Sequence, residues 1–248
     1  MRNIRLIARL DIKAPNLVKG IQLEGLRKMG DPNEFALKYY LQGADEIFYA
    51  DIVASLYERN SLLDIIEKTT DNVFVPITVG GGLRSIGDVS AALRAGADKV
   101  IIGSEAFQNP EFIEKGSERF GNQCITVSID YKKNSNSEEE VFVVNGQQPT
   151  GWYPIEWSKK VETLGAGEIL LYSIDRDGSR QGYDLEVLQQ VSEAVKIPVI
   201  ACGGVGQSQH IKDGFEMGSV SGVAAGSFFV FQGHQRSVLI SYNKDYAN

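Results

Sequence analysis

The segment VPITVGGGLRS (75–85) decides the fold, because IPVIACGGVGQS (197–208) repeats its pattern about 120 residues further along the chain. Each segment is a short apolar run, typical of a buried strand, that leads into Gly-Gly. Nearly the same offset relates two more pairs of segments: GADEIFYADI (43–52) with GAGEILLYSID (165–175), and KVIIGSEAF (99–107) with GVAAGSFFV (222–230). A repeat with this period predicts two related halves, approximately 1–120 and 121–248.

Short β-rich segments alternate with helical patterns along the whole chain. The eight β-rich segments are 4–11, 46–54, 75–81, 99–104, 124–130, 168–175, 197–204 and 220–227, and clear helical patterns are 33–43, 86–96, 155–165 and 185–195. Apolar strands joined by helices are typical of a parallel sheet that is covered on both faces. Eight such units predict an α/β protein with a single domain over 1–248, a (β/α)8 TIM barrel with an internal twofold half-barrel repeat.

The stretch 132–151 does not fit this alternation. It is polar, then strand-like, then rich in turn residues. We expect a long loop with a small hairpin after the fifth strand. Such an insertion lies at the C-terminal face of the barrel, where TIM barrels place their active sites.

Composition and charge narrow the classes of function. The 32 acidic residues outnumber the 25 basic residues, giving a net charge of −7 without any basic run, which argues against a nucleic-acid-binding protein. No apolar stretch has the length of a signal-peptide core or a membrane span. The two cysteines, Cys124 and Cys202, lie in apolar stretches, as core thiols of a cytoplasmic protein do. Neither His210 nor His234 has the spacing of a metal-ligand set, so we expect no metal site.

Small residues follow the third and fourth strands of each half in matching positions. Gly-Gly follows the third strand and Gly-Ser the fourth: Gly81-Gly82 and Gly103-Ser104 in the first half, Gly203-Gly204 and Gly226-Ser227 in the second. Taken singly, such glycines are best explained as tight turns. Their pairing favours anion binding, because glycine lets backbone N–H groups approach a phosphate and serine adds a donor. The sequence therefore predicts two phosphate sites on opposite sides of the barrel mouth, for a ligand with a phosphate at each end.

Aspartates follow opposite strands in the same paired manner. Asp11 and Asp130 end the first and fifth strands, so both carboxyl groups are expected to point into the mouth as a general acid/base pair. Asp51 and Asp175 end the second and sixth strands, and we expect them to orient substrate hydroxyls or loop backbones. Lys19 follows the first strand. Its sequence context fits a clamp on an anionic substrate and a solvated loop lysine equally well.

Motifs over nearly the whole chain resemble those of the HisF family, the cyclase subunits of imidazole glycerol phosphate synthase in histidine biosynthesis. The matching motifs include LDIK…LVKG (10–20), P.TVGGG.RS (76–85), RAGADKV (94–100), GAGEIL..S.DRDG (165–178) and IPVIA.GGVG (197–206). The resemblance implies a lyase that works without a cofactor. The substrates of such a lyase are ammonia and the bisphosphorylated PRFAR (phosphoribulosyl-formimino-aminoimidazole carboxamide ribotide). Its products are imidazole glycerol phosphate and the ribotide AICAR. The resemblance also implies a heterodimer with a HisH-like glutaminase, which docks on the N-terminal face and whose ammonia passes through the barrel.

The resemblance implies roles for individual residues. Asp11 and Asp130 are the acid/base pair, Lys19 belongs to a mobile loop over the substrate, and Asp98 lies at the glutaminase interface. Residues implied to hold the two phosphates are Gly82, Gly103, Ser104, Asp177, Gly178, Gly204, Gly226 and Ser227. Residues implied to form a charged gate for ammonia are Arg5, Glu46, Lys99 and Glu168.

Several positions near the expected site depart from the family's usual residues: Arg9 stands in place of Cys, Gly103-Ser104 in place of Asn-Thr, Tyr172 in place of Thr, and Cys202 in place of Ser. The loop over 13–32 also differs from the family's usual DGRVVKG. Arg9 shares a strand face with Asp11, so we expect it to lower the pKa of Asp11 and to alter ammonia passage. Two other functions therefore stay open. One is a paralogue that carries ammonia from a glutaminase to a separate amidotransferase in bacterial surface-sugar amidination. The other is a phosphosugar isomerase that needs no ammonia and acts on ProFAR, the aldose precursor of PRFAR.

Overall fold

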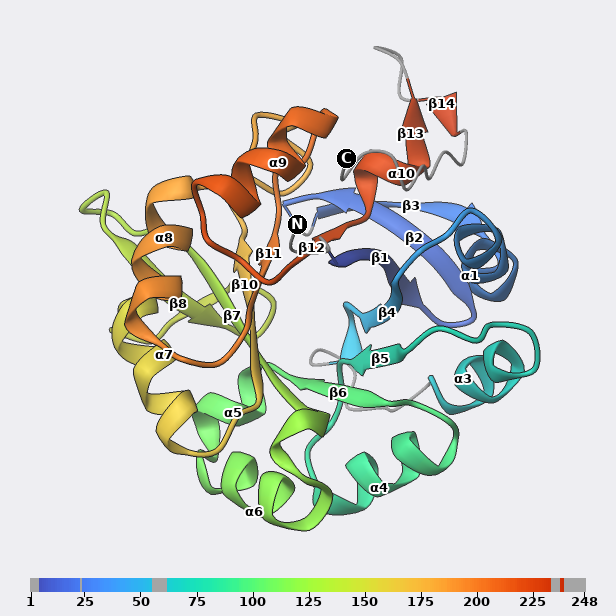
Figure 1. Ribbon diagram of the computed structural model, residues 1–248, viewed down its shortest axis with the longest axis horizontal. Coiled ribbons are helices and arrows are strands. Elements are labelled where there is room, and N and C mark those ends of the chain that lie inside the picture. Colours follow the sequence, from blue (N-terminus) through green and yellow to red (C-terminus); the bar gives the residue numbers. More distant parts are fainter. Residues whose placement is uncertain (1–4, 23, 55–61, 233–236, 239–248) are drawn as a thin grey trace.

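Eight parallel strands close into a ring in the structure, a computed structural model that describes residues 5–22, 24–54, 62–232 and 237–238. Around the ring (Figure 1) the strands follow chain order, and the last pairs with the first: β1 (Arg5–Lys13), β4 (Glu46–Asp51), β5 (Ile77–Gly80), β6 (Lys99–Ile102), β7 (Ile125–Lys133), β10 (Glu168–Ser173), β11 (Val199–Cys202) and β12 (Gly222–Ala225). All eight predicted strands are present. The predicted (β/α)8 barrel is confirmed.

Helices surround the ring of strands (Figure 1). They are α1 (Pro32–Leu41), α3 (Leu63–Thr70), α4 (Ile86–Arg94), α5 (Ser104–Gln108), α6 (Glu111–Phe120), α7 (Pro154–Thr163), α8 (Leu185–Ala194), α9 (Ser208–Glu216) and α10 (Ser227–Val230), with a 3-10 turn η1 (Asn122–Cys124). Local sequence sets their ends. Asp31 caps α1 by accepting a hydrogen bond from the Asn33 N–H at 2.8 Å, and Pro32 occupies the first turn.

The apolar core has two layers, one on each side of the ring. Alternate residues of β1 show the division: Leu6 packs in the outer layer with Tyr39 of α1, whereas Ile7 packs in the inner layer with Phe48 and Leu170. This is the inward and outward alternation of a strand that is buried on both faces. The inner layer fills the middle of the barrel, so polar side chains inside the barrel are confined to its two ends.

Two barrel strands continue into antiparallel hairpins. β1 pairs with β2 (Asn16–Ile21), which pairs with β3 (Glu24–Gly30), so the stretch expected to be a loop around Lys19 is a hairpin instead. β7 pairs with β8 (Glu139–Val143), which pairs with the short β9 (Gln148–Pro149), and this agrees with the hairpin predicted in 132–151. A separate two-stranded ribbon, β13 (Phe231–Gln232) with β14 (Ser237–Val238), lies beside the barrel in Figure 1.

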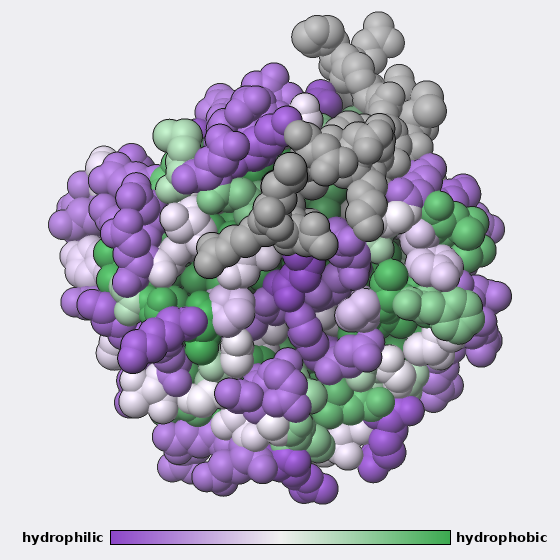
Figure 2. Space-filling model, in the orientation of Figure 1, coloured by the Kyte–Doolittle hydropathy of each residue, from purple (hydrophilic) through white to green (hydrophobic). Residues whose placement is uncertain are grey.

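The order of the ring places β1 and β7 opposite each other, with three strands between them on either side. Because all eight strands run in parallel, their carboxyl ends meet at one face of the barrel and their amino ends at the other. Figure 2, in the orientation of Figure 1, shows hydrophilic residues at the middle of the face in view.

Within the described residues, no helix combines the length and the apolar character needed to cross a bilayer.

Candidate functional site

Two cavities open at the carboxyl ends of the strands, and Arg9 lines both of them. The first lies over β4 to β7 and includes Gly82, Gly103 and Ser104 in its wall. The second lies over β11, β12 and the segment after β10, and its lining residues include Lys19, Asp177, Gly178, Gly204, Gly226 and Ser227. The predicted glycine and serine positions therefore divide between two cavities, one for each half of the ring.

Asp130 lies in the wall of the first cavity. Its carboxylate accepts a hydrogen bond from the Ser128 hydroxyl at 2.5 Å. Enclosure among protein atoms raises the pKa of Asp130, and the hydrogen bond from Ser128 and the charge of Arg9 oppose this rise only in part. Asp130 therefore combines a position in the cavity wall with a pKa above the usual value of an aspartate.

Asp11 is buried between two cations instead of lining a cavity. Its carboxylate accepts from Arg9 Nε at 2.7 Å and pairs with Lys19 Nζ. Burial favours the neutral form, but the positive charges of Arg9 and Lys19 outweigh it and lower the pKa of Asp11. The expected effect of Arg9 on Asp11 is confirmed. Arg9 and Lys19 cover the Asp11 carboxylate, so of the two predicted aspartates Asp130 lines a cavity directly and Asp11 lies behind two cations that line one.

The glycines of the two cavities allow close approach of neighbouring backbone. A Cβ at Gly81, where φ is +101°, would overlap the Asp51 carbonyl oxygen and lie 2.9 Å from the Asp51 Cβ. A Cβ at Gly226 would lie 2.6 Å from Lys19 Nζ, so glycine leaves room for this ammonium group. Gly81 therefore permits the close approach of the Asp51 backbone, and Gly226 permits the position of the Lys19 ammonium group.

The second pair of aspartates holds loop backbone. Asp51 accepts from the Val53 N–H at 3.1 Å and lines the first cavity, and Asp175 accepts from the Lys133 N–H at 2.9 Å. These contacts match the predicted orientation of loop backbones, and they tie the segments after β4 and β10 to their surroundings.

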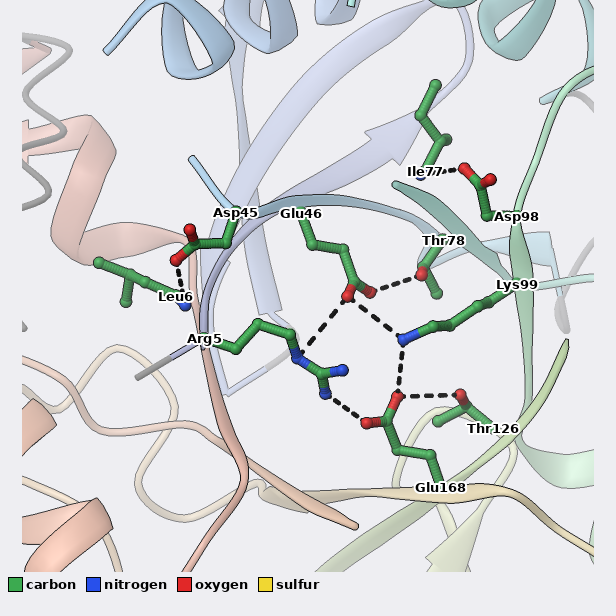
Figure 3. Close-up of polar contacts among 10 residues, drawn as sticks. All are labelled: Arg5, Leu6, Asp45, Glu46, Ile77, Thr78, Asp98, Lys99, Thr126 and Glu168. Atoms are coloured by element: carbon green, nitrogen blue, oxygen red, sulfur yellow. Dashed lines mark hydrogen bonds and ion pairs between the residues drawn. The ribbon is translucent and has the colours of Figure 1, made fainter. Parts of the chain in front are cut away.

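A cluster of charged side chains fills the other end of the barrel (Figure 3). Glu46 of β4 accepts from Lys99 Nζ at 3.3 Å and from the Thr78 hydroxyl at 2.6 Å. Glu168 of β10 accepts from Lys99 Nζ at 3.2 Å and pairs with Arg5 of β1. Two carboxylates and two cations from four strands therefore balance each other across the barrel. The four residues implied as a gate by the resemblance are in contact with one another.

Two aspartates lie beside this cluster at the same face (Figure 3). Asp98 accepts from the Ile77 N–H at 2.8 Å, and Asp45 accepts from the Leu6 N–H at 3.0 Å. Asp98 is exposed, so it is accessible to a partner protein at this face.

A comparison with known families identifies the chain. A family model described as "Histidine biosynthesis protein" matches residues 5–235. The chain belongs to the histidine biosynthesis protein family. Within this family, the imidazole glycerol phosphate synthase subunit HisF of Legionella pneumophila is 56% identical over 210 residues, which is 85% of this chain and 99% of that protein.

Sequence reasoning noted Arg9, Tyr172 and Cys202 as separate departures within this family, but it did not foresee that they touch. The Arg9 guanidinium lies 4.3 Å from the centre of the Tyr172 ring, and its NH1 group donates to Cys202 Sγ at 3.1 Å. The alternation of side chains along the strands could have indicated this contact, since the three residues lie at inward positions of β1, β10 and β11.

Among the described residues, no group of His, Cys, Asp and Glu side chains has the arrangement of a metal site.

Replacement of Lys99 by Met is expected to lower the free energy of unfolding by about 2–3 kcal/mol, because Glu46 and Glu168 lose a shared cation in a largely buried place. Urea denaturation followed by circular dichroism measures this. Lys115→Met is the matched control, since it breaks a 2.8 Å ion pair between exposed residues of α6 and should leave the midpoint unchanged. Equal midpoints for both variants would show that the cluster adds no stability.

Proposed function

We propose that this protein is the cyclase subunit of imidazole glycerol phosphate synthase, which joins ammonia to PRFAR and releases imidazole glycerol phosphate and AICAR. The observation that carries the proposal is the 56% identity to the HisF subunit over 99% of that protein. The geometry supports it, because two cavities with glycine-rich walls meet at Arg9 and so suit a ligand with a phosphate at each end.

The overall reaction requires protons to move in both directions. PRFAR and ammonia together contain the atoms of imidazole glycerol phosphate, AICAR and one water molecule. The ammonia nitrogen must lose protons as it bonds to two carbon atoms, while the departing oxygen and the departing AICAR nitrogen must gain them. We assign this exchange to Asp11 and Asp130. Asp130 meets the ligand in the first cavity, and Asp11, whose pKa is lowered against the effect of burial by Arg9 and Lys19, supplies a carboxylate that stays ionised.

The two phosphate groups are assigned to the two cavities. Gly82, Gly103 and Ser104 line one, with Asp51 beside them. The other site comprises Asp177, Gly178, Gly204, Gly226 and Ser227, and Lys19 Nζ lies at its edge. We infer that a phosphate in the second cavity competes with Asp11 for the Lys19 ammonium group, which would open the way to Asp11 when substrate binds.

Ammonia is assigned to the opposite end of the barrel. We propose that a HisH-like glutaminase docks on the face that carries Asp98, and that Arg5, Glu46, Lys99 and Glu168 control entry into the barrel. This cluster lies next to the apolar inner layer, on the side opposite the two cavities, so ammonia that enters at the cluster has to cross that layer to reach the proposed substrate site. Both cysteines are free thiols, as in proteins of reducing compartments, and we place this function in the cytoplasm.

The test supplies purified protein with PRFAR and a high concentration of ammonium salt at mildly alkaline pH. Formation of AICAR is followed by absorbance, and imidazole glycerol phosphate is identified by mass spectrometry. Turnover that requires both PRFAR and ammonium is the expected result. Glutamine alone should give turnover only after a HisH-like glutaminase is added.

Absence of turnover would contradict the proposal. A parallel reaction with ProFAR alone tests the isomerase function, for which product would form without ammonia. The alternative role in surface-sugar amidination is not favoured by the comparisons, and it predicts no AICAR in the first reaction.

A further inference from the structure

Arg9 is a buried cation at the junction of the two cavities. Its side chain is 7% exposed, yet Arg9 lines the walls of both cavities. A ligand that reaches from one cavity into the other must therefore pass this residue. The surroundings of Arg9 decide what such a ligand meets there.

The Arg9 guanidinium is held from three sides. Its Nε donates to Asp11 on the same strand at 2.7 Å, its NH1 donates to Cys202 on β11 at 3.1 Å, and its Cζ atom lies 4.3 Å from the centre of the Tyr172 ring on β10. Phe48 of β4 adds a second, more distant aromatic contact at 5.8 Å. These contacts fix the position of the side chain, since a planar guanidinium needs both its donors and its face satisfied to stay in one place.

The contacts to Asp11 and Cys202 leave one nitrogen of the Arg9 guanidinium, NH2, for other acceptors. A guanidinium carries five N–H donors, and the contacts to Asp11 and Cys202 use one each. Neither of these hydrogen bonds uses the NH2 group, and the Arg9 side chain lines both cavities. An oxygen acceptor on a ligand that spans the two cavities can therefore pair with this charged donor, and charge-assisted hydrogen bonds of this kind are among the stronger ones in proteins.

Building on the proposed function, we infer that Arg9 is a substrate-binding and specificity-determining residue: its NH2 group donates to an oxygen acceptor in the middle of the ligand, between the two phosphates. Asp11 acts as the counterion that anchors Arg9, and Tyr172 and Cys202 set its orientation. The ligand class is an elongated bisphosphate with a carbonyl, hydroxyl or anionic oxygen near its centre. A bisphosphate without such an oxygen would leave the Arg9 donor unpaired and bind more weakly.

The experiment compares Arg9→Met with the wild type by calorimetric titration of two probes, PRFAR without ammonia and inorganic phosphate. The dissociation constant for PRFAR should rise about 10- to 100-fold, as expected for loss of a charged hydrogen bond. The dissociation constant for phosphate should stay within about twofold, because the groups assigned to the phosphates are the glycine and serine positions of each cavity, whereas the lost donor is assigned to the middle of the ligand. Arg9→Lys keeps the charge and should recover part of the PRFAR affinity.

Arg119→Met is the matched control, since Arg119 is exposed on α6 and stacks on Phe120. It should leave both dissociation constants unchanged. Equal weakening of both probes by Arg9→Met would overturn the inference in favour of general electrostatic attraction or misfolding, and thermal unfolding separates these two. Unchanged PRFAR affinity would also overturn it. A wild type that binds PRFAR but does not convert it with ammonium contradicts the proposed function alone.

Discussion

Asp130→Asn is expected to reduce the rate of ammonium-dependent turnover about 10²- to 10⁴-fold, the range typical for loss of a general acid or base. Asparagine has the same shape and can still accept from the Ser128 hydroxyl, so the wall of the first cavity should persist. Loss of proton transfer then lowers kcat, while KM for PRFAR changes little. Steady-state kinetics at saturating ammonium measure both constants.

Asp64→Asn is the control for this experiment, because Asp64 is an exposed aspartate on α3, outside both cavities. It should have wild-type kinetics. A rise in KM for Asp130→Asn at constant kcat would show that Asp130 binds substrate without transferring a proton. Asp11→Asn is a less selective test, because it leaves Arg9 and Lys19 without their shared carboxylate and so disturbs the second cavity as well.

Gly204→Ala is expected to lower the free energy of unfolding by roughly 3–5 kcal/mol, the sum of backbone strain and overpacking. Gly204 has φ +111°, and a Cβ there would overlap the Gly182 carbonyl oxygen and lie 3.2 Å from the Arg176 Cβ. The carbonyl of Gly204 also accepts from the Gly182 N–H at 2.8 Å, so the two segments cannot separate without losing that bond. Urea denaturation measures the loss.

Gly151→Ala isolates the contribution of the backbone angle. Gly151 has a similar positive φ of +75°, but a Cβ there would meet nothing within 4 Å, so the cost should be only about 1–2 kcal/mol. Equal losses for the two variants would show that the contact between Gly182 and Gly204 adds nothing. The difference between them is the contribution of tight packing in the wall of the second cavity.

The barrel and its paired glycines were predictable because both follow from local patterns. Apolar runs that alternate with helical periods define the strands, and the internal repeat places Gly82 and Gly204 at equivalent positions of the two halves. The β2–β3 hairpin was missed, since its sequence mixes charged, glycine and apolar residues without a clear two-residue period. Its pairing depends on β1, which extends to Lys13, past the strand end expected from sequence.

The surroundings of Arg9 and Asp11 could not be predicted, for a different reason. Alternation along β1 put the two side chains on one face, and their ion pair follows from that. The contacts of Arg9 to Tyr172 and Cys202 join residues far apart in sequence, through the curvature of the ring. The pairing of Lys19 with Asp11 depends on the β1–β2 hairpin, which was not predicted. Such contacts depend on tertiary packing, which a sequence period does not contain.

The pairing of β1 with β12 has a consequence for synthesis of the chain. Arg5 lies beside Gly222, so the first strand gains its second neighbour only after some 217 further residues exist. At translation rates of about 5–20 residues per second, that delay lasts roughly 10–40 s. Throughout it, one side of the nascent β1 keeps unsatisfied amide and carbonyl groups that can pair with other chains. The first strand is therefore open to pairing with other chains for nearly the whole time of synthesis, and the last strand ends that period.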